Sequence, residues 1–225
     1  NMIMSKTLIV KNIDRISYLK ALELQHAIHS DCSEAKDPGA LILLEHDPVI
    51  TLGVKNSSAD NVLVNKDFLA SKDVQLVETD RGGDATYHGP GQLVGYPIFQ
   101  LRDLNVDLHG YLRSLEQVII DTLAEFGLTG ERNGPAGVWV GDKKVCSIGV
   151  AIRRKTTYHG FALNINPNMQ HFTYINPCGL RSEQLASLSM LLGKTPDMNE
   201  VKHIVAQKFA NIFCFDSLLF TDVDI

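Results

Sequence analysis

A continuous apolar run at residues 40–45 places the strongest constraint on the fold. It reads Ala-Leu-Ile-Leu-Leu-Glu and lies between Gly39 and Pro48, so it has the length of a strand. A strand without alternation of apolar and polar residues is typical of a sheet that is covered on both faces. We therefore expect this segment to lie inside a sheet, with a second strand at residues 49–52.

Three segments carry helical patterns. Residues 17–29 have apolar side chains at roughly helical spacing, and residues 108–126 carry a strong i, i+3, i+4, i+7 stripe. Asp107 can cap the start of this second helix and Gly127 its end. The third helix opens at a capping box formed by Asp197 and Glu200.

The remaining strands mix with these helices without strict β-α-β alternation. They are predicted at residues 8–10 (an edge strand), at 138–140 and 145–153 (a hairpin), and at 161–165. This order predicts an α+β fold, with a mixed sheet flanked by helices. Since no repeat, low-complexity tract or Ser/Gly linker interrupts residues 1–225, we expect one domain.

Composition indicates an ordinary globular protein. The 225 residues are 44% hydrophobic and 21% charged, with a net charge of −5, which excludes wholesale disorder and a broadly basic surface for nucleic acid. No run reaches the ~18 apolar residues of a membrane-spanning helix. The N-terminus lacks a secretory-signal pattern, and Asn1 ahead of Met2 is interpreted as a cloning remnant. We expect a reducing, cytoplasmic location.

The four cysteines form no recognisable metal or disulfide framework. Cys32, Cys146, Cys178 and Cys214 include no C-x-x-C pair, and no two histidines have the spacing of zinc ligands. A metal site is therefore not expected. Cys146 and Cys214 lie among apolar residues and are interpreted as packing residues, whereas Cys32 has no apparent role.

A glycine-rich segment at residues 81–92 is the densest local signal. It reads Arg-Gly-Gly-Asp-Ala-Thr-Tyr-His-Gly-Pro-Gly-Gln, which cannot form the interior of a helix. Glycine lets the backbone approach a ligand closely, and the interleaved polar residues supply donors. A decorated turn is the simpler interpretation, but the density of donors favours a binding loop. The spacing matches neither a phosphate-cradling loop nor a dinucleotide site.

Cys178 is the best candidate for a nucleophile. It lies in Asn-Pro-Cys-Gly at residues 176–179, where proline and glycine indicate a loop. A reactive thiolate must be reached by its substrate, and a rigid, partly exposed loop meets that need.

Lys144 begins a face of the predicted strand that continues through Cys146, Ile148, Val150 and Ile152. From spacing alone, a lysine whose ammonium extends to solvent at the hairpin end is the favoured interpretation. If Lys144 is buried instead, loss of water would suit it for proton transfer.

Small residues recur in two strand segments. Ser147-Ile148-Gly149 and His159-Gly160-Phe161-Ala162 are consistent with close packing of neighbouring chains and equally with the floor of a ligand pocket. Spacing does not decide between the two.

In this order and spacing, these motifs resemble the octanoyl-protein transferases of lipoate biosynthesis. The resemblance runs from residue 48 to about residue 193. It rests on the segments 81–92, 137–140 (Gly-Val-Trp-Val), 144–149 (Lys-Val-Cys-Ser-Ile-Gly), 159–164 (His-Gly-Phe-Ala-Leu-Asn) and 177–179. It implies the fold of the biotin and lipoyl transferases and ligases.

The resemblance also implies site residues. Cys178 would be the nucleophile and Lys144 its partner. The substrate pocket would be built from Arg81, Gly82, Gly83, Asp84, Ala85, Thr86, Tyr87, His88, Ser147, Ile148, Gly149, Gly160, Phe161 and Ala162.

The implied activity is octanoyl transfer through an acyl-cysteine thioester. The donor would be octanoyl-acyl carrier protein, and the acceptor the lysine amine of a lipoyl domain or of glycine-cleavage H protein. Neither ATP nor a metal is expected, since the donor is already activated and carries its own phosphopantetheine. Arg153-Arg154-Lys155 is a candidate docking patch for these acidic partners, although a solvated strand end explains it equally well.

Three other functions stay open. An ATP-dependent lipoate or biotin ligase would need an adenylate site, and an amidotransferase would take octanoyl from another lipoyl domain. A carrier-binding module without catalysis would form a complex but no covalent adduct. The loop, lysine and cysteine together favour transfer.

Overall fold

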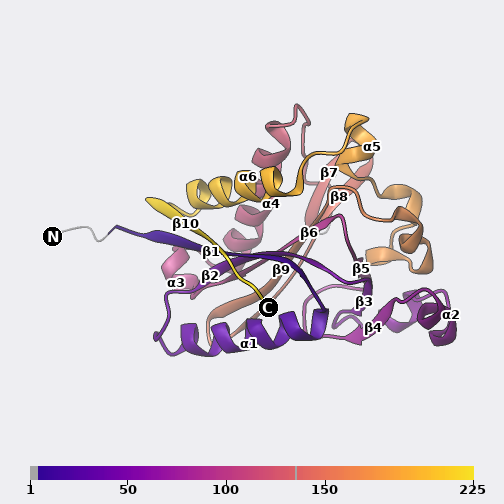
Figure 1. Cartoon of the computed structure of the whole chain (residues 1–225), viewed down its shortest axis with the longest axis horizontal. Helices are drawn as coiled ribbons and strands as arrows, with labels where there is room; N and C mark the ends of the chain where they lie inside the picture. The colour runs from indigo at the N-terminus through magenta and orange to yellow at the C-terminus, as the bar shows by residue number, and fades with distance from the viewer. Residues whose placement is uncertain (1–4, 135) are drawn as a thin grey trace.

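A seven-stranded mixed sheet forms the centre of the computed structural model, which describes residues 5–134 and 136–225 (Figure 1). Its strands are β1 (Thr7–Ile16), β2 (Ala40–His46), β6 (Gln92–Ile98), β7 (Gly137–Val140), β8 (Lys143–Arg153), β9 (Thr156–Asn164) and β10 (Ser217–Asp222). Their order is β10-β1-β2-β6-β9-β8-β7. The β10–β1 and β1–β2 pairs are parallel and the others antiparallel.

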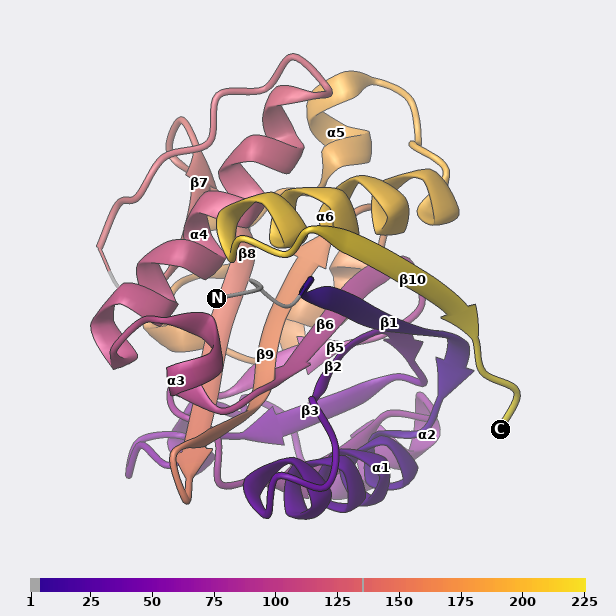
Figure 2. The ribbon, with the colours of Figure 1, turned by 90° about the vertical axis from the view of Figure 1, so that its left-hand side faces the viewer.

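Helices cover both faces of this sheet (Figure 2). Helix α1 (Tyr18–Ser33) packs on β6 and β9, and α4 (Leu108–Ala124) and α6 (Met198–Ile212) pack together on the opposite face. Their predicted starts are confirmed: the side chains of Ser17, Asp107 and Asp197 each accept a hydrogen bond from a backbone N–H of the first turn. The shorter helices are α3 (Leu101–Leu104) and α5 (Leu188–Leu192). The predicted α+β architecture is therefore confirmed.

The strand at residues 40–45 is central, as predicted. Residues 40–44 of β2 have no exposed surface, and β1 and β6 flank the strand. The prediction of an edge strand at residues 8–10 is wrong. β1 is ten residues long and lies between β2 and β10, because the last strand of the chain returns to cover it.

A second, three-stranded sheet carries the glycine-rich segment. It consists of β3 (Val49–Leu52), β4 (Gln75–Glu78) and β5 (Thr86–His88), in the order β4-β3-β5, with α2 (Lys66–Ser71) beside β4. This sheet has a small core of its own, which includes Ile50, Leu69 and Tyr87. The glycine-rich loop joins β4 to β5 and so projects from this sheet.

β8 and β9 form a second hairpin that the sequence did not predict. β9 begins at Thr156 rather than at residue 161, and Arg154 and Lys155 form the turn with φ values of +49° and +59°. Two-residue turns of this kind usually contain Asn-Gly, so the sequence carried no signal for it. Arg153-Arg154-Lys155 is therefore a hairpin tip.

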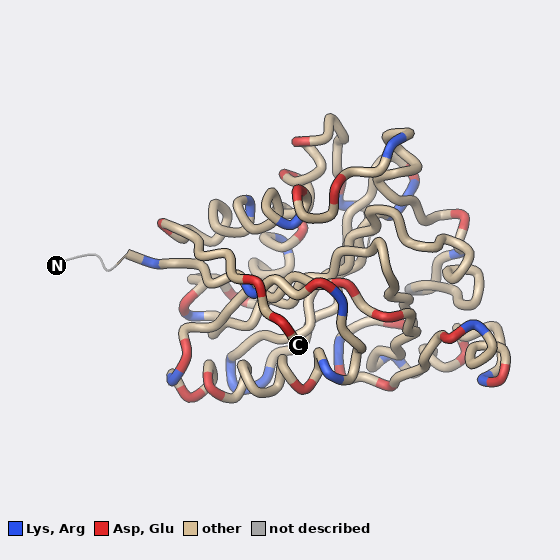
Figure 3. Tube along the Cα trace, in the orientation of Figure 1, with Lys and Arg blue, Asp and Glu red and all other residues tan. Residues whose placement is uncertain are grey.

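Charged residues of both signs are interspersed along the trace (Figure 3). Within the described residues, no helix combines the length and the apolar run that crossing a membrane requires.

Candidate functional site

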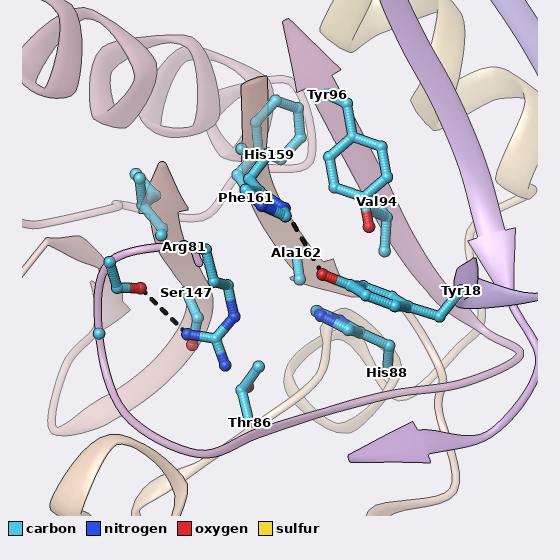
Figure 4. Close-up of a pocket in the computed structure, with 15 residues that line it drawn as sticks. Tyr18, Arg81, Thr86, His88, Val94, Tyr96, Ser147, His159, Phe161 and Ala162 are labelled. Carbon is cyan, nitrogen blue, oxygen red and sulfur yellow. Dashed lines mark hydrogen bonds between the residues drawn. The ribbon is translucent and has the colours of Figure 1, made fainter. Parts of the chain in front are cut away.

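A pocket lies between the glycine-rich loop and the middle of the large sheet, on the side that α1 covers (Figure 4). It contains about 440 Å³ of empty space, part of it open to solvent. We call it the inner pocket; it is lined by Tyr18, Arg81, Gly82, Gly83, Thr86, His88, Val94, Tyr96, Ser147, Ile148, Gly149, His159, Gly160, Phe161 and Ala162.

Three separate segments that the sequence singled out meet in this pocket: the glycine-rich loop with β5, residues 147–149 and residues 160–162. Asp84, Ala85 and Tyr87 do not line it. Successive residues of a strand face opposite sides, so Thr86 and His88 border the pocket whereas Tyr87 packs into the core of the small sheet. Ala85 belongs to the same core.

Arg81 and Asp84 fix the shape of the glycine-rich loop. The buried guanidinium of Arg81 donates to the hydroxyl of Thr51 (2.8 Å) and to the backbone oxygen of Asp84 (2.7 Å). The carboxylate of Asp84 accepts from Asn61 Nδ2 (2.8 Å) and Ser57 Oγ (3.0 Å). The loop is thereby attached to β3 and to the segment 57–61 that follows it, and Asp84 holds the loop from outside the inner pocket.

Two glycines of the pocket floor lie where neighbouring backbone leaves no room for a side chain. A Cβ at Gly149 would stand 2.6 Å from the backbone oxygen of Gly82, and one at Gly160 would collide with the backbone oxygen of Gly95. The two interpretations of these small residues, close packing and a pocket floor, therefore both hold. The close packing at Gly149 brings the glycine-rich loop against β8.

Aromatic residues that the sequence did not reveal close one end of the pocket. The ring of Tyr18 is stacked on that of His88 at 6.2 Å between centroids, and its hydroxyl lies 3.5 Å from His159 Nδ1 (Figure 4). The hydroxyl of Tyr96 lies 2.6 Å from Nε2 of the fully buried His46. These residues come from α1, β2, β5, β6 and β9, so only the tertiary fold brings them together.

Two imidazoles at this end are buried and uncharged. Burial lowers the pKa of His88 to about 3 and that of His46 to about 4, so both imidazoles are neutral at pH 7. Burial also lowers the pKa of His159, against the opposing effect of Asp80, whose carboxylate is 2.8 Å from its Nε2.

Lys144 is buried, with 2% of its surface exposed, so the solvent-extended interpretation is wrong. A bulge in β8 changes the direction in which the Lys144 side chain points. Val138 pairs with Cys146 but Trp139 pairs with Lys144, which leaves Val145 as an extra residue. Val145 and Cys146 both pack in the large core, so the alternation that placed Lys144 on the face of Cys146 fails at this point. The ammonium instead lies over the ring of Trp139, 5.0 Å from its centroid.

The segment that carries Cys178 is anchored on both sides. Cys178 belongs to the short 3-10 turn Pro177–Gly179, and its side chain lies outside the described part of the structure. Before the turn, Asn176 N donates to Asn61 O (2.8 Å); after it, Ala186 N donates to the backbone oxygen of Lys144 (3.0 Å). The same stretch of chain is thus held against Lys144, and the direct pairing of the two side chains stays a prediction.

Residues 17–210 match the sequence model of the family described as "Lipoyl protein ligase A/B catalytic domain". This chain belongs to that family. Curated relatives named octanoyltransferase include one from Solibacter usitatus (strain Ellin6076), 43% identical over 93% of this chain and 94% of its own length. Another, from Caldicellulosiruptor bescii, is 43% identical over 89% of each chain. The resemblance to octanoyl-protein transferases is confirmed.

Solved structures share the fold of this lipoyl ligase A/B domain at lower sequence identity. Lipoate-protein ligase A bound with ATP has a TM-score of 0.80 at 17% identity, and the alignment covers 98% of this chain and 89% of that one. The biotin protein ligase from Aquifex aeolicus has a TM-score of 0.52 at 13% identity, over 94% and 70% of the two chains. The predicted transferase–ligase fold is therefore confirmed.

The other cysteines of this family member differ sharply in their surroundings. Burial raises the pKa of Cys146 to about 12 and also raises the pKa of Cys32, so both thiols stay protonated near pH 7. Cys214, which was expected to pack, is exposed.

A second cavity adjoins the inner pocket. This outer groove contains about 1060 Å³ of empty space, much of it open to solvent, and has one apolar wall formed by Leu108 and Leu112 of α4. It shares Gly82, Gly83, Ile148 and Gly149 with the inner pocket. Its other lining residues are Lys55, Asp84, Ala136, Lys144, Val150, Ala151 and Ile152. The groove therefore connects the surroundings of Lys144 to the wall of the inner pocket.

Proposed function

We propose that this protein transfers an octanoyl group from octanoyl-acyl carrier protein to a lysine of a lipoyl domain or of glycine-cleavage H protein. The observation that carries the proposal is the identity of more than 40% with octanoyltransferases along nearly the whole chain. The buried Lys144, held against the segment of Cys178, supports it.

The proposed reaction has two steps. The thiolate of Cys178 attacks the donor thioester, the bond between the carbonyl carbon and the carrier sulfur breaks, and the carrier thiol leaves with a proton. The neutral ε-amine of the acceptor then attacks the acyl-cysteine, forms the amide and returns Cys178 as a thiol. Each step needs one proton moved at sulfur or nitrogen. Lys144 serves this need, as a cation beside the thiolate or as a neutral base.

The inner pocket suits the octanoyl chain. Val94, Ile148, Phe161 and Ala162 supply apolar walls, and the neutral histidines at the far end add no charge that the chain would have to desolvate. No step of this scheme uses ATP or a metal.

The hairpin tip is the proposed docking point for acidic carriers. Arg153, Arg154 and Lys155 lie together at the β8–β9 turn, beside a hollow lined by His26 and His29 of α1. A local basic tip can attract an acidic partner even though the whole chain carries a charge of −5.

An ATP-dependent ligase is the second candidate, favoured by the likeness to lipoate-protein ligase A bound with ATP. It predicts that octanoate and ATP modify a lipoyl domain and that replacement of Cys178 has no effect. The transferase predicts the reverse.

Mass spectrometry after incubation with octanoyl-acyl carrier protein tests the proposal. An octanoyl adduct is expected on Cys178 and should be absent from Cys178→Ser. Cys146→Ser is the matched control and should keep the adduct, because Cys146 is buried with a raised pKa. An adduct mapped to Cys146, or ATP-dependent modification by Cys178→Ser, would overturn the proposal.

A further inference from the structure

One edge of β8 is unpaired over half of its length. β7 accompanies β8 only as far as Ser147, where it pairs through Gly137, whereas β9 continues beside β8 to Arg153. Beyond Ser147, no strand among the described residues pairs with the other edge of β8. Five consecutive residues, 148–152, line the outer groove, which shows that the strand presents its edge there rather than one face.

The backbone groups at this edge can be identified from the hairpin register. The two-residue turn makes Arg153 and Thr156 a hydrogen-bonded pair, and such pairs alternate along an antiparallel ladder. Ile152, Val150 and Ile148 therefore direct their N–H and C=O groups away from β9. Two bonds agree: Thr157, opposite Ile152, donates its N–H to Phe99 O (2.9 Å), and Val150 O accepts from Gly82 N (2.9 Å).

The groove thus combines a row of backbone donors and acceptors with an apolar wall. Among the described residues, Gly82 is the one that bonds to the edge formed by residues 148–152, and Leu108 and Leu112 of α4 line the groove as well. An extended ligand with amides spaced along a narrow, otherwise apolar chain matches such a surface, as a peptide strand matches a sheet edge.

We propose that the outer groove binds the pantetheine arm of the acyl donor along residues 148–152 of β8, through the N–H and C=O groups that the Gly82 contact leaves unbonded. The inference rests on the proposed function, which requires a donor thioester to reach Cys178. A pantetheine arm carries two amides in one unbranched stretch, and its thioester end must lie where the acyl chain can enter the inner pocket. Among the described residues, only Gly82, Gly83, Ile148 and Gly149 line both cavities.

The dimensions agree with this placement. At ~3.3 Å per strand residue, Ile148 and Ile152 lie about 13 Å apart. The arm has roughly thirteen bonds between phosphorus and sulfur, which span about 15 Å at the rise of an extended backbone. An arm whose phosphate lies next to Arg153 therefore places its sulfur near Ile148. Gly137, which pairs with neighbouring Ser147, is also where the end of the Lys144 side chain lies.

Three thioester donors test the role of the amides on the unaltered protein. Octanoyl thioesters of pantetheine, N-acetylcysteamine and ethanethiol carry two, one and no amides on the thiol side. Single-turnover acylation of Cys178, followed by mass spectrometry, should slow by about tenfold with each amide removed. Equal rates for the three donors would overturn the proposal.

A proline tests the edge itself. Ile152→Pro removes an N–H that does not bond to β9, and proline is tolerated at such edge positions. The rate ratio between the pantetheine and ethanethiol donors should fall by about tenfold, whereas Ile152→Val, which keeps the N–H, should retain the ratio. If Ile152→Pro does not fold, a pantetheine donor with an ester in place of one amide removes the donor group from the ligand instead.

The outcomes separate this proposal from the proposed function. An octanoyl adduct on Cys178 from the carrier protein, with no dependence on the amides, would refute the arm site and leave the transferase intact. Failure of every donor to acylate Cys178 would refute the transferase. If Ile152→Pro is acylated normally but transfers octanoyl to a lipoyl domain more slowly, the edge of β8 binds the acceptor protein. This result would overturn the proposal that it binds the pantetheine arm.

Discussion

Among the described residues, two lysines are buried, and their ammonium groups have different partners. Lys202, on α6, has 1% of its surface exposed and donates to Asn12 Oδ1 (2.7 Å) and to Ile13 O (3.0 Å). Its ammonium thus fastens α6 to β1. Lys144, on β8, has 2% exposed, and its ammonium lies over the ring of Trp139 beside Gly137.

The comparison predicts that burial alone does not make a lysine reactive. Hydrogen bonds to fixed acceptors hold Lys202 in one position, where any loss of its proton would break them. A ring face attracts a cation without accepting one particular hydrogen, so Lys144 can turn toward a substrate or a thiol. The contrast predicts that chemistry depends on Lys144 and stability on Lys202.

The largest effect is expected from Lys144→Met. Acylation of Cys178 by octanoyl-acyl carrier protein should fall by at least about 100-fold, because proton transfer by a positioned group contributes that much or more. Lys202→Met is the matched control and should acylate at the rate of the unaltered protein. Single-turnover mass spectrometry measures both. An unchanged rate in Lys144→Met would show that Lys144, like Lys202, has a structural role. It would contradict the prediction that the chemistry depends on Lys144.

Lys202→Met should act on stability instead. The variant leaves Asn12 Oδ1 and Ile13 O without their donor, so the free energy of unfolding should fall by about 1–3 kcal/mol. Urea denaturation measures this loss. A variant as stable as the unaltered protein would show that these bonds contribute little.

The pH dependence sharpens the same prediction. Burial lowers the pKa of Lys202, so the unfolded chain binds this proton more tightly than the folded one. Lys202 therefore makes stability rise with pH between its folded pKa and the unfolded value near ~10.4. Lys202→Met should lack this rise.

The sequence predicted most of the frame around these two lysines. The central strand, the three long helices and the β7–β8 hairpin follow from apolar runs, helical stripes and caps, which depend on residues close together in the chain. The segments that meet in the inner pocket were singled out by their small residues, but spacing left close packing and a pocket floor open, and only the family resemblance implied a substrate pocket.

What the sequence could not show depends on contacts between distant residues. The bulge at Val145 is invisible to alternation, so Lys144 was placed on the face of Cys146, and its position at the hairpin end favoured an ammonium in solvent. The turn at Arg154-Lys155 lacks the usual glycine, so the first half of β9 was missed. Tyr18 and Tyr96 reach the inner pocket from α1 and β6, and no local pattern marks them.

Gly137→Ala should disturb the Lys144 site directly. A Cβ there would stand 2.7 Å from Lys144 Cε and 2.7 Å from Cys146 O, so the end of the lysine side chain must shift. Small misplacements of reacting groups are costly, and acylation should slow by about tenfold. Its pH profile should also move, which a loss of stability alone would not cause.

Gly141→Ala provides the control for this variant. Gly141 also has a positive φ, of +60°, but nothing lies within 4 Å of an added Cβ. This change strains the β7–β8 turn and should cost stability without slowing acylation. Equal slowing in both variants would show that Gly137 acts through the hairpin rather than through Lys144.

The smallest effect is expected from Trp139→Phe. A cation over an aromatic ring gains ~0.5–2 kcal/mol, and the gain is larger over Trp than over Phe. Loss of part of this energy should slow acylation by about twofold to fivefold. Trp139→Leu removes the ring and should slow acylation further. Lys202 has no aromatic partner of this kind among the described contacts, so neither variant should change the bonds that hold α6 to β1. Equal rates for the two variants would mean that Trp139 fills space beside Lys144 and that the ring face plays no part in holding the ammonium.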